Sequence, residues 1–455
     1  MRAGAALAVL VLCAASAAAQ ENDDLDLIPG TIGQAPVPPP ADTAAAHGKY
    51  YVENATGFSS FRGTFAVPPP YSHGSPWGNR TSFDAYDQWR LAPGLQLTYS
   101  DRFSATFSDG VGFPEEAVRN DLREAYLTWE PVPLTYVDAG RINLRNGVAY
   151  GFNPTDFFRA RTTVAQASAD PLAQRENRLG TFMLRAQHVF DGGTVGFVYA
   201  PKLHTPAPVG AVADWIDPKI DQTNADDRFL ASLSFELEEF SPQVLVYHAA
   251  GRTKLGLNIS HPVGNAIIAY ASWAGGVAPN VTADAIAFGK RTGVVPPVVT
   301  APDTRRSFRN ELSLGASWTG SAKVTVVAEY HFNEAGFSKQ DWRDWFATGT
   351  DPQAASLAWY VRGYAGDLQT PQSQHEAFLW TSVTDVFHIP QLSMGGFVMT
   401  DLMDGSGLAQ FSVSYNLDNN WSVGAYASGS MGGARTNWGS MTGAASMIFQ
   451  VSRYL

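Results

Sequence analysis

Apolar and polar residues alternate in many segments of this chain, and this pattern limits the fold more than any other feature. In 228–237, five apolar side chains fall on one face: Phe229, Ala231, Leu233, Phe235 and Leu237. The same alternation recurs in 323–332 and 409–417. Because successive side chains of a β-strand point to opposite faces, each segment predicts a strand with one apolar and one polar face. Such strands build either a soluble β-sandwich or a membrane β-barrel.

The lengths of the segments and of their connections favour the barrel. Many segments run for about ten residues, the length with which a tilted strand crosses a bilayer. Short connections, such as 191–193 and 418–420, alternate with long ones, such as 203–227 and 333–374. Outer-membrane barrels have this asymmetry, with short periplasmic turns and long external loops. The prediction is an all-β, transmembrane antiparallel barrel, and a soluble secreted β-protein is the alternative.

Counting the segments predicts eighteen strands. Seventeen are expected near 82–91, 95–107, 121–130, 134–141, 180–190, 194–202, 228–237, 242–250, 253–260, 266–274, 308–318, 323–332, 375–385, 392–400, 407–417, 421–429 and 445–455. If the short turns lie on the periplasmic side, the last strand, 445–455, ends on the periplasmic side. The first strand in this list, 82–91, then begins on the external side. An additional strand near 57–66 brings the chain up from the periplasm. The total is then even, as in bacterial barrels, with both termini periplasmic; sixteen strands is the alternative.

The start of the chain predicts export from the cytoplasm. A short positive start, an apolar stretch and the A-x-A site at Ala17–Ala19 predict a secretory signal peptide over residues 1–19. A lipoprotein signal modified at Cys13 is the alternative. Residues 20–48 are acidic and then rich in Pro and Ala, which predicts a flexible periplasmic segment. The barrel is expected over 49–455.

Composition agrees with a barrel in the outer membrane of a Gram-negative bacterium. Charged residues make up 16% of the chain, against about 25% in soluble proteins, and aromatic residues 12%. Of the 31 basic residues, Arg2 lies in the signal, so 30 oppose 42 acidic ones, and the formal charge of −12 argues against nucleic-acid binding. Cys13 is the only cysteine, so the mature chain has no disulfide. Four Asn-x-Ser/Thr triplets, beginning at Asn54, Asn79, Asn258 and Asn280, are expected to be incidental in bacteria.

The aromatic residues and the C-terminus indicate contacts with the membrane and with the barrel-assembly machinery. Six tryptophans at or near strand ends are expected in interfacial girdles facing lipid and lipopolysaccharide: Trp89, Trp129, Trp273, Trp318, Trp380 and Trp421. The last strand ends in SMIFQVSRYL, where Met447, Phe449 and Val451 share a face. This ending is similar to the C-terminal assembly signal of outer-membrane proteins. Arg453 is expected to extend to the headgroups.

The most motif-like stretch, GRINLRNGVAYGFNPTDFF, runs from Gly140 to Phe158 and begins the third external loop, about 142–179. No Gly-Lys-Ser/Thr follows its glycines, so it is not a phosphate-binding loop. We interpret Gly147, Gly151, Asn153 and Pro154 as structural residues of the loop. Asn153 is expected to cap a short helix with Pro154 in its first position.

Charge in this region predicts a constriction of the pore. Between 141 and 185 there are seven arginines and three acids, a net charge of +4 in an acidic protein. We predict that the loop folds into the lumen and that six residues of this region line the narrowest part: Arg141, Arg145, Asp156, Arg159, Arg161 and Arg185. A solvated external loop held by salt bridges is the alternative.

The pattern GR…NG…GFNPTDFF resembles the Gly-Arg…Asn-Pro-x-Asp loop of large outer-membrane barrels related to alginate-export porins. The resemblance covers about 120–202, including ENRLGTFMLRAQHVF and TVGFVYAPKL. It implies transport or export across the outer membrane and does not identify the solute.

The predicted function is a passive channel for transport or export of small hydrophilic solutes, anions among them, without enzymatic activity or a cofactor. A carrier for hydrophobic or lipid-like molecules is an alternative, with Phe152, Phe157 and Phe158 as its path. A hydrolase at the barrel rim is another, which would use His248 or His331. Loop acids in 223–227 and 401–407 match no full Ca²⁺ ligand spacing, so no metal site is predicted. A homo-oligomer is left open.

Overall fold

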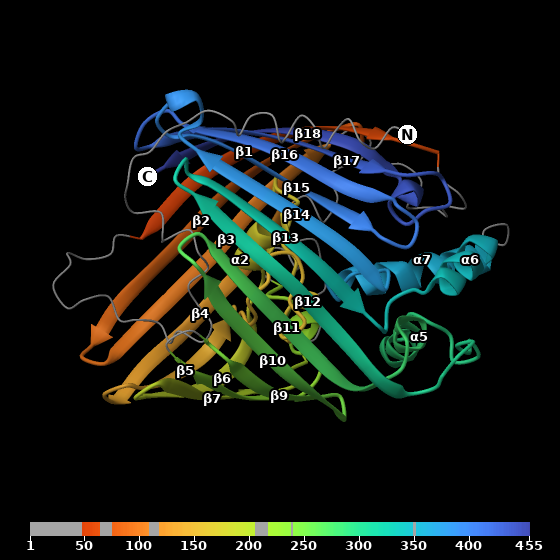
Figure 1. The fold of residues 1–455 in the computed structure, drawn as a ribbon, viewed down its shortest axis with the longest axis horizontal. Helices are drawn as coiled ribbons and strands as arrows, with labels where there is room; N and C mark the ends of the chain where they lie inside the picture. The colour runs from red at the N-terminus through yellow and green to blue at the C-terminus, as the bar shows by residue number, and fades with distance from the viewer. Residues whose placement is uncertain (1–47, 64–74, 109–117, 205–216, 238–239, 349–351) are drawn as a thin grey trace.

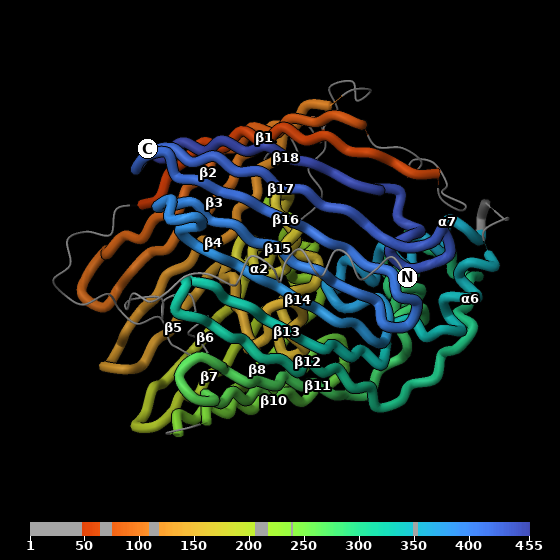
Figure 2. Tube along the Cα trace, turned by 45° about the horizontal axis from the view of Figure 1, so that its top comes forward, coloured from red at the N-terminus to blue at the C-terminus, as the bar shows by residue number. Residues whose placement is uncertain are grey.

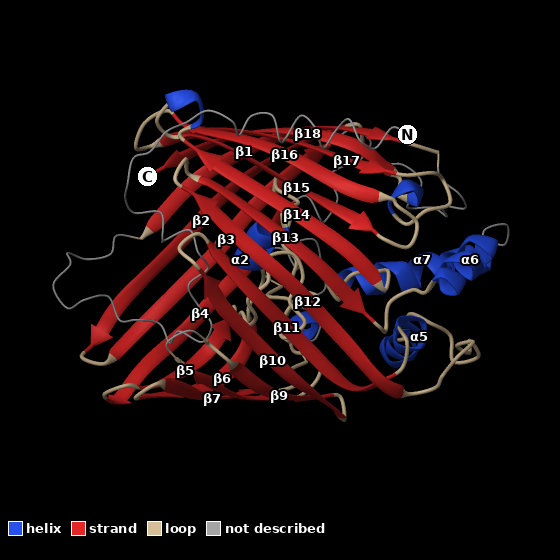
Figure 3. Ribbon diagram, in the orientation of Figure 1, coloured by secondary structure: helices blue, strands red, loops and turns tan. Residues whose placement is uncertain are grey.

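A computed structural model shows a closed barrel of eighteen antiparallel strands (Figures 1 and 3). It describes residues 48–63, 75–108, 118–204, 217–237, 240–348 and 352–455. Each strand pairs with its neighbours in sequence, and β1 closes the barrel by pairing with β18. The predicted fold class and the predicted number of strands are both confirmed. The predicted signal peptide and nearly all of the segment 20–48 lie outside the described residues.

The strands follow the predicted alternating segments closely. Their bounds are β1 Lys49–Phe61, β2 Trp77–Ala92, β3 Leu95–Ser108, β4 Val118–Val132, β5 Thr135–Ile142, β6 Thr181–Phe190, β7 Gly193–Ala200, β8 Arg228–Phe235, β9 Gln243–Ala249, β10 Arg252–Val263, β11 Ile267–Ala278, β12 Ser307–Gly320, β13 Val324–Asn333, β14 His375–Thr384, β15 Leu392–Asp401, β16 Gly407–Asn416, β17 Trp421–Met431 and β18 Gly443–Tyr454. The extra strand expected near 57–66 is β1, which begins earlier, at Lys49.

The two ends of the barrel differ. Tight hairpin turns and the C-terminus lie at one end, and the helices α5 (Val281–Thr292), α6 (Lys339–Ala347) and α7 (Pro352–Asp367) gather at the other (Figure 1). A core of tryptophan, phenylalanine and aliphatic side chains holds these three helices together. None of the helices in the described ranges is long and apolar enough to span a bilayer.

Alternation along the strands separates an outer apolar surface from a polar lumen. On β8, Phe229 and Leu233 are exposed on the outside, whereas Leu230 and Ser234 are buried on the inside. On β16, Gln410 lies inside, where it contacts the loop between β5 and β6. The outer aromatic residues include Trp89, Trp129, Trp318 and Trp421, each more than a third exposed.

One tryptophan differs from the girdle prediction. Trp380 lies in the middle of β14, and its indole N–H donates to Asp170 of the β5–β6 loop at 2.8 Å. The Trp380 side chain therefore points into the lumen. It shares the inner face of β14 with Phe378, because residues two apart on a strand point to the same side.

Strand length varies strongly around the barrel. Strands β2, β3 and β4 have 16, 14 and 15 residues. On the wall formed by β7, β8 and β9 the strands have only 8, 8 and 7 residues.

Candidate functional site: a loop inside the barrel

The connection from β5 to β6, residues 143–180, folds into the lumen. Its one helix, α2 (Pro171–Glu176), lies within the outline of the barrel in both Figures 1 and 2. Asp170 caps this helix by accepting the N–H of Leu172 at 3.0 Å, and Pro171 occupies the first helical position. The prediction of a third loop folded inward is confirmed by these positions and by its contacts with the wall.

One side of the loop docks on β10 and β12. The Thr155 hydroxyl donates to Asn258 on β10 at 2.8 Å, and Ser313 on β12 donates to the carbonyl of Phe152. Gly256 makes this approach possible, since a Cβ there would lie 3.0 Å from the Thr155 methyl group and 3.3 Å from the Phe157 ring. Because Gly256 has no side chain, Thr155 and Phe157 of the loop can pack directly against the backbone of β10.

A buried carboxylate on β13 holds the tip of the loop. Glu329 accepts the backbone N–H of Tyr150 at 2.6 Å and that of Gly151 at 2.9 Å. His331 lies 2.7 Å from Glu329 and 3.0 Å from Glu376 of β14. Each imidazole nitrogen of His331 therefore contacts a carboxylate. Because His331 is held by Glu376 on one side, it fixes the position of Glu329 on the other.

The loop also reaches the opposite wall. Arg102 on β3 donates to the carbonyl of Ala165 at 3.2 Å, and Arg123 on β4 contacts the Asn177 side chain at 3.3 Å. On β16, Gln410 accepts the N–H of Ala169 at 2.7 Å. The loop therefore braces the lumen from β3 across to β16.

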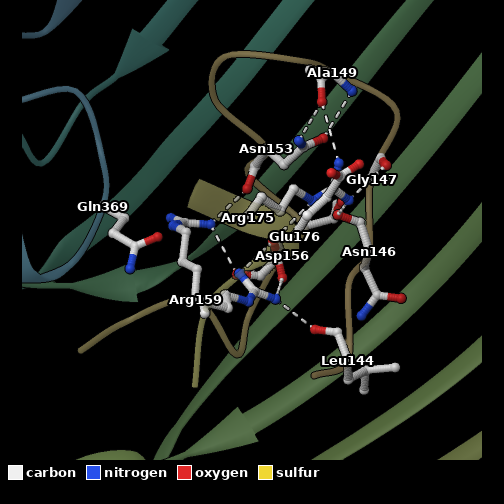
Figure 4. Close-up of polar contacts among 12 residues, drawn as sticks. Leu144, Asn146, Gly147, Ala149, Asn153, Asp156, Arg159, Arg175, Glu176 and Gln369 are labelled. Carbon is white, nitrogen blue, oxygen red and sulfur yellow. Dashed lines mark hydrogen bonds and ion pairs between the residues drawn. The ribbon is translucent and has the colours of Figure 1, made fainter. Parts of the chain in front are cut away.

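Inside the loop, Asp156 is the centre of an ion cluster (Figure 4). Arg178 donates to both carboxylate oxygens, at 2.8 and 2.9 Å, and Arg175 lies 3.3 Å away. Burial alone would raise the pKa of Asp156, but the two guanidinium groups lower it below its ordinary value. Burial lowers the pKa of Arg175 to about 10. Asp156 and Arg178 therefore form a buried bidentate ion pair, and Arg175 adds a second, longer ionic contact.

Asn153 does not begin a helix, contrary to the prediction. Its side chain accepts the N–H of Ala149 at 2.8 Å and donates to the Ala149 carbonyl, closing a compact turn (Figure 4). Residues around Pro154 form turns only. Gly147 is required beside this turn, because it has φ 93° and a Cβ there would lie 2.3 Å from the Asn153 side chain.

Two predicted constriction arginines connect the loop to its surroundings. Arg159 pairs with Glu311 of β12 at 3.0 Å and donates to the Leu368 carbonyl at 3.2 Å. Arg161 lies over the Phe288 ring of α5, 4.1 Å from its centroid. Both therefore tie the loop to the wall or to the helices at the barrel end.

Two further predicted residues lie in strands, where Arg141 is buried and Arg185 is partly buried. Arg141, at the end of β5, donates to the carbonyls of Gly180 and Pro218. Arg185 on β6 pairs with Asp138 at 2.7 Å. The role of these arginines in lining a pore stays a prediction.

Arg145 differs from the other five predicted residues because its side chain is exposed. It makes no hydrogen bond or ion pair with any residue that the structure describes. The next strand wall is close, since the Asn143 N–H donates to Glu124 of β4 at 3.0 Å and the charges of Arg145 and Glu124 interact. Arg145 is thus the predicted constriction residue whose charge faces water.

The sequence did not reveal the partners of the loop on the wall. Asn258, Ser313 and Glu329 sit at ordinary inward positions of alternating strands, and only the fold shows which inward positions meet the loop. The acidic loop at 401–407 is also explained: Asp401 accepts the Met403 N–H and Asp404 the Ser406 N–H, both at 2.8 Å. Among the described residues, no group of three or more His, Cys, Asp or Glu side chains could hold a metal ion.

The chain thus forms a closed antiparallel β-barrel of eighteen strands with a loop inserted in its lumen. No family model and no curated protein matches the sequence. The structure is similar to Pseudomonas aeruginosa OccK5 (OpdH), with a TM-score of 0.52 and 8% identity over 90% of this chain and 97% of that one. It is equally similar to P. aeruginosa OpdK solved with vanillate, with a TM-score of 0.52 and 9% identity over 90% and 98%. At this identity the likeness concerns the fold, and kinship with alginate-export porins stays a prediction.

Proposed function

We propose that this protein is an outer-membrane channel for passive transport or export of small hydrophilic solutes, with a preference for anions. The observation that carries this proposal is the β5–β6 loop, which is anchored to β3, β4, β10, β12, β13 and β16 inside the lumen. A loop that spans the bore excludes large solutes and leaves a narrow polar path.

The preference for anions rests on the charge of Arg145, which is exposed to water. Asp156, the acid nearest the centre of the loop, is neutralised by Arg175 and Arg178, whereas Arg145 is exposed without a partner among the described residues. A guanidinium group binds carboxylates and phosphates through a planar fork. The structurally similar protein OpdK was solved with vanillate, and small organic carboxylates are the solutes that we propose here.

The hydrophobic carrier finds less support. Phe157 stacks on Tyr247 with 4.5 Å between ring centroids, and Phe152 lies against His331 at 5.8 Å. Phe158 is also buried, beside Arg228. These rings fasten the loop to the wall and are not arranged along an open path.

The rim hydrolase also finds less support. Both nitrogens of His331 contact carboxylates, and His248 contacts only Thr253, at 2.9 Å, on the outer surface. Neither histidine joins a hydroxyl nucleophile to an acid within the described ranges.

Planar-bilayer recording of the purified, folded protein tests the channel. We expect discrete conductance steps, and in a salt gradient a zero-current potential of the sign given by anion selectivity. A folded protein that conducts no ions at any voltage or salt concentration contradicts the proposal.

We further propose that the C-terminal strand engages the barrel-assembly machinery, that both termini are periplasmic and that the outer girdle contacts lipopolysaccharide.

A further inference from the structure

Two Asn-x-Thr triplets lie side by side on the first two strands. Asn54 and Thr56 are two residues apart on β1, and Asn79 and Thr81 are two apart on β2, so each pair shares one face of its strand. The register places Asn54 opposite Thr81 and Thr56 opposite Asn79. The sequence assigned no function to these triplets. In the fold, Asn54, Thr56, Asn79 and Thr81 form one four-residue cluster, here called the amide quartet.

The amide quartet is closed by reciprocal hydrogen bonds. Asn54 donates to the Asn79 amide oxygen at 3.1 Å and to the Thr81 hydroxyl at 2.8 Å. Asn79 donates to the Asn54 amide oxygen at 3.0 Å and to the Thr56 hydroxyl at 2.8 Å. Each amide therefore uses both of its N–H groups within the quartet.

This cluster faces away from the lumen. Glu53, which precedes Asn54 on β1, pairs with Arg102, whose guanidinium also contacts Ala165 of the inserted loop, so Glu53 faces inward. By the alternation of the strand, Asn54 and Thr56 then face outward, as do Val52 and Phe58, which are 39% and 51% exposed.

The amide quartet also lies at the depth of the apolar belt. Asn54 pairs with Val451 of β18, and Thr56 pairs with Phe449. Exposed apolar side chains surround it on β1, β2, β3 and β18: Val52, Phe58, Phe83, Phe103, Met447, Phe449 and Val451. On the outer faces of β7 to β10 the corresponding positions are apolar, with Phe197, Phe229, Val246 and Leu257 exposed.

Lipid chains cannot satisfy what the cluster leaves open. The hydroxyl protons of Thr56 and Thr81 have no acceptor among the described residues, and each amide oxygen retains a lone pair. Polar side chains within a membrane ordinarily face protein, where they form hydrogen bonds between neighbouring elements. The surface offers donors and acceptors together and carries no net charge, so it is complementary to itself, as a two-fold interface requires. Headgroup phosphates only accept hydrogen bonds and lie at the membrane surface.

We propose that the amide quartet and its apolar surround form the contact between two copies of this chain, with the β1–β2 faces meeting across a two-fold axis. Val52 and Phe83 then pack at the edge of the contact, and the threonine hydroxyls donate to amide oxygens of the partner.

The mature sequence has no cysteine, which makes cross-linking a direct test. Phe83→Cys places a thiol beside the quartet without changing it, and Leu257→Cys on β10 is a matched control, because both native side chains are 41% exposed on the outer surface. With a short bifunctional thiol reagent applied to isolated outer membranes, we expect a two-chain band from F83C and none from L257C. Native mass spectrometry of the untreated protein should give twice the chain mass.

A second variant separates the proposed contact from a mere neighbourhood. Asn54→Leu with Asn79→Leu, in the F83C background, removes the hydrogen-bonding groups while favouring lipid contact, and we expect the cross-linked band to fall at least tenfold. Heat-dependent gel migration shows that this variant is folded. The proposal fails if F83C gives no two-chain band, if the leucine variant retains it, or if native mass spectrometry finds one chain with bound lipid. It also fails if the band appears only after deletion of residues 20–46, because the chain's own N-terminal segment would then cover the face.

Discussion

Replacing Asp156 with asparagine should release the inserted loop while leaving the barrel intact. Asparagine has nearly the same shape, but it removes the charge that Arg178 contacts through two hydrogen bonds and Arg175 at 3.3 Å. The buried Arg178 and the partly buried Arg175 would then lose this anionic partner. The same arginines also hold the carbonyls of Leu144 and Asn146, at 2.6 and 2.7 Å, so a shift in either one loosens the turn around them.

The expected magnitude follows from the burial of the pair. Arg178 and Asp156 are 2% and 3% exposed, so solvent screens them little. Removing one partner from a buried ion pair costs about 3–5 kcal/mol. Since each 1.4 kcal/mol is about a factor of ten, the bound position of the loop should lose roughly two to four orders of magnitude in population relative to displaced forms.

Single-channel recording measures this effect. D156N should show larger or fluctuating conductance steps at the same voltage, and a lower temperature for the loss of the folded form on gels. Asp303→Asn is the control, because Asp303 pairs at 3.1 Å with an Arg305 side chain that is 87% exposed. Conductance, noise and thermal stability of D156N identical to those of D303N would refute this role of the Asp156 ion pair.

Three further results are expected. Arg145→Gln should shift the zero-current potential toward cation selectivity, more strongly at 0.1 M salt, where the screening length is about 10 Å, than at 1 M, where it is about 3 Å; an unchanged potential would exclude Arg145 from the ion path. Gly256→Val should displace the loop at a cost of about 1–3 kcal/mol, because its side chain would meet Thr155, and increased open-channel noise checks this. The pKa of Asp156 is lowered, so its contribution to stability is complete above about pH 4 and is lost as the pH falls through the lowered pKa. Thermal melts from pH 7 to pH 3 should therefore fall more steeply for wild type than for D156N.

The strand pattern was predictable because it depends on local chemistry. The alternation of apolar and polar side chains along a strand does not depend on which strands pair with one another. The alternation of short and long connections then required an even number of strands, which predicted the additional first strand. The start of β1 at Lys49 was missed because the apolar outer face of KYYVENA is interrupted by the amide Asn54, where a lipid-facing strand is expected to be apolar.

The inside of the lumen was less predictable, because contacts between distant residues decide it. Asn153 and Pro154 carry a good helix-start signal, but the Asn153 side chain is used by Ala149. The arginine cluster correctly indicated a special loop, whereas the spacing could not show that Arg178 would be neutralised by Asp156 and Arg145 left exposed. Trp380 resembles a girdle residue until Asp170 is brought beside it.

The uneven strand lengths have a consequence for the surrounding lipid. Strands of seven and eight residues, as in β7, β8 and β9, extend roughly 25 Å along their axes and, at a tilt of about 45°, rise only about 18 Å. The hydrocarbon layer of a typical bilayer is about 30 Å thick, so lipids beside this wall must shorten or tilt, while those beside β2 to β4 need not. The bilayer around the protein is therefore expected to be thinner beside β7 to β9 than beside β2 to β4. The wall of short strands should then face regions of thinner membrane.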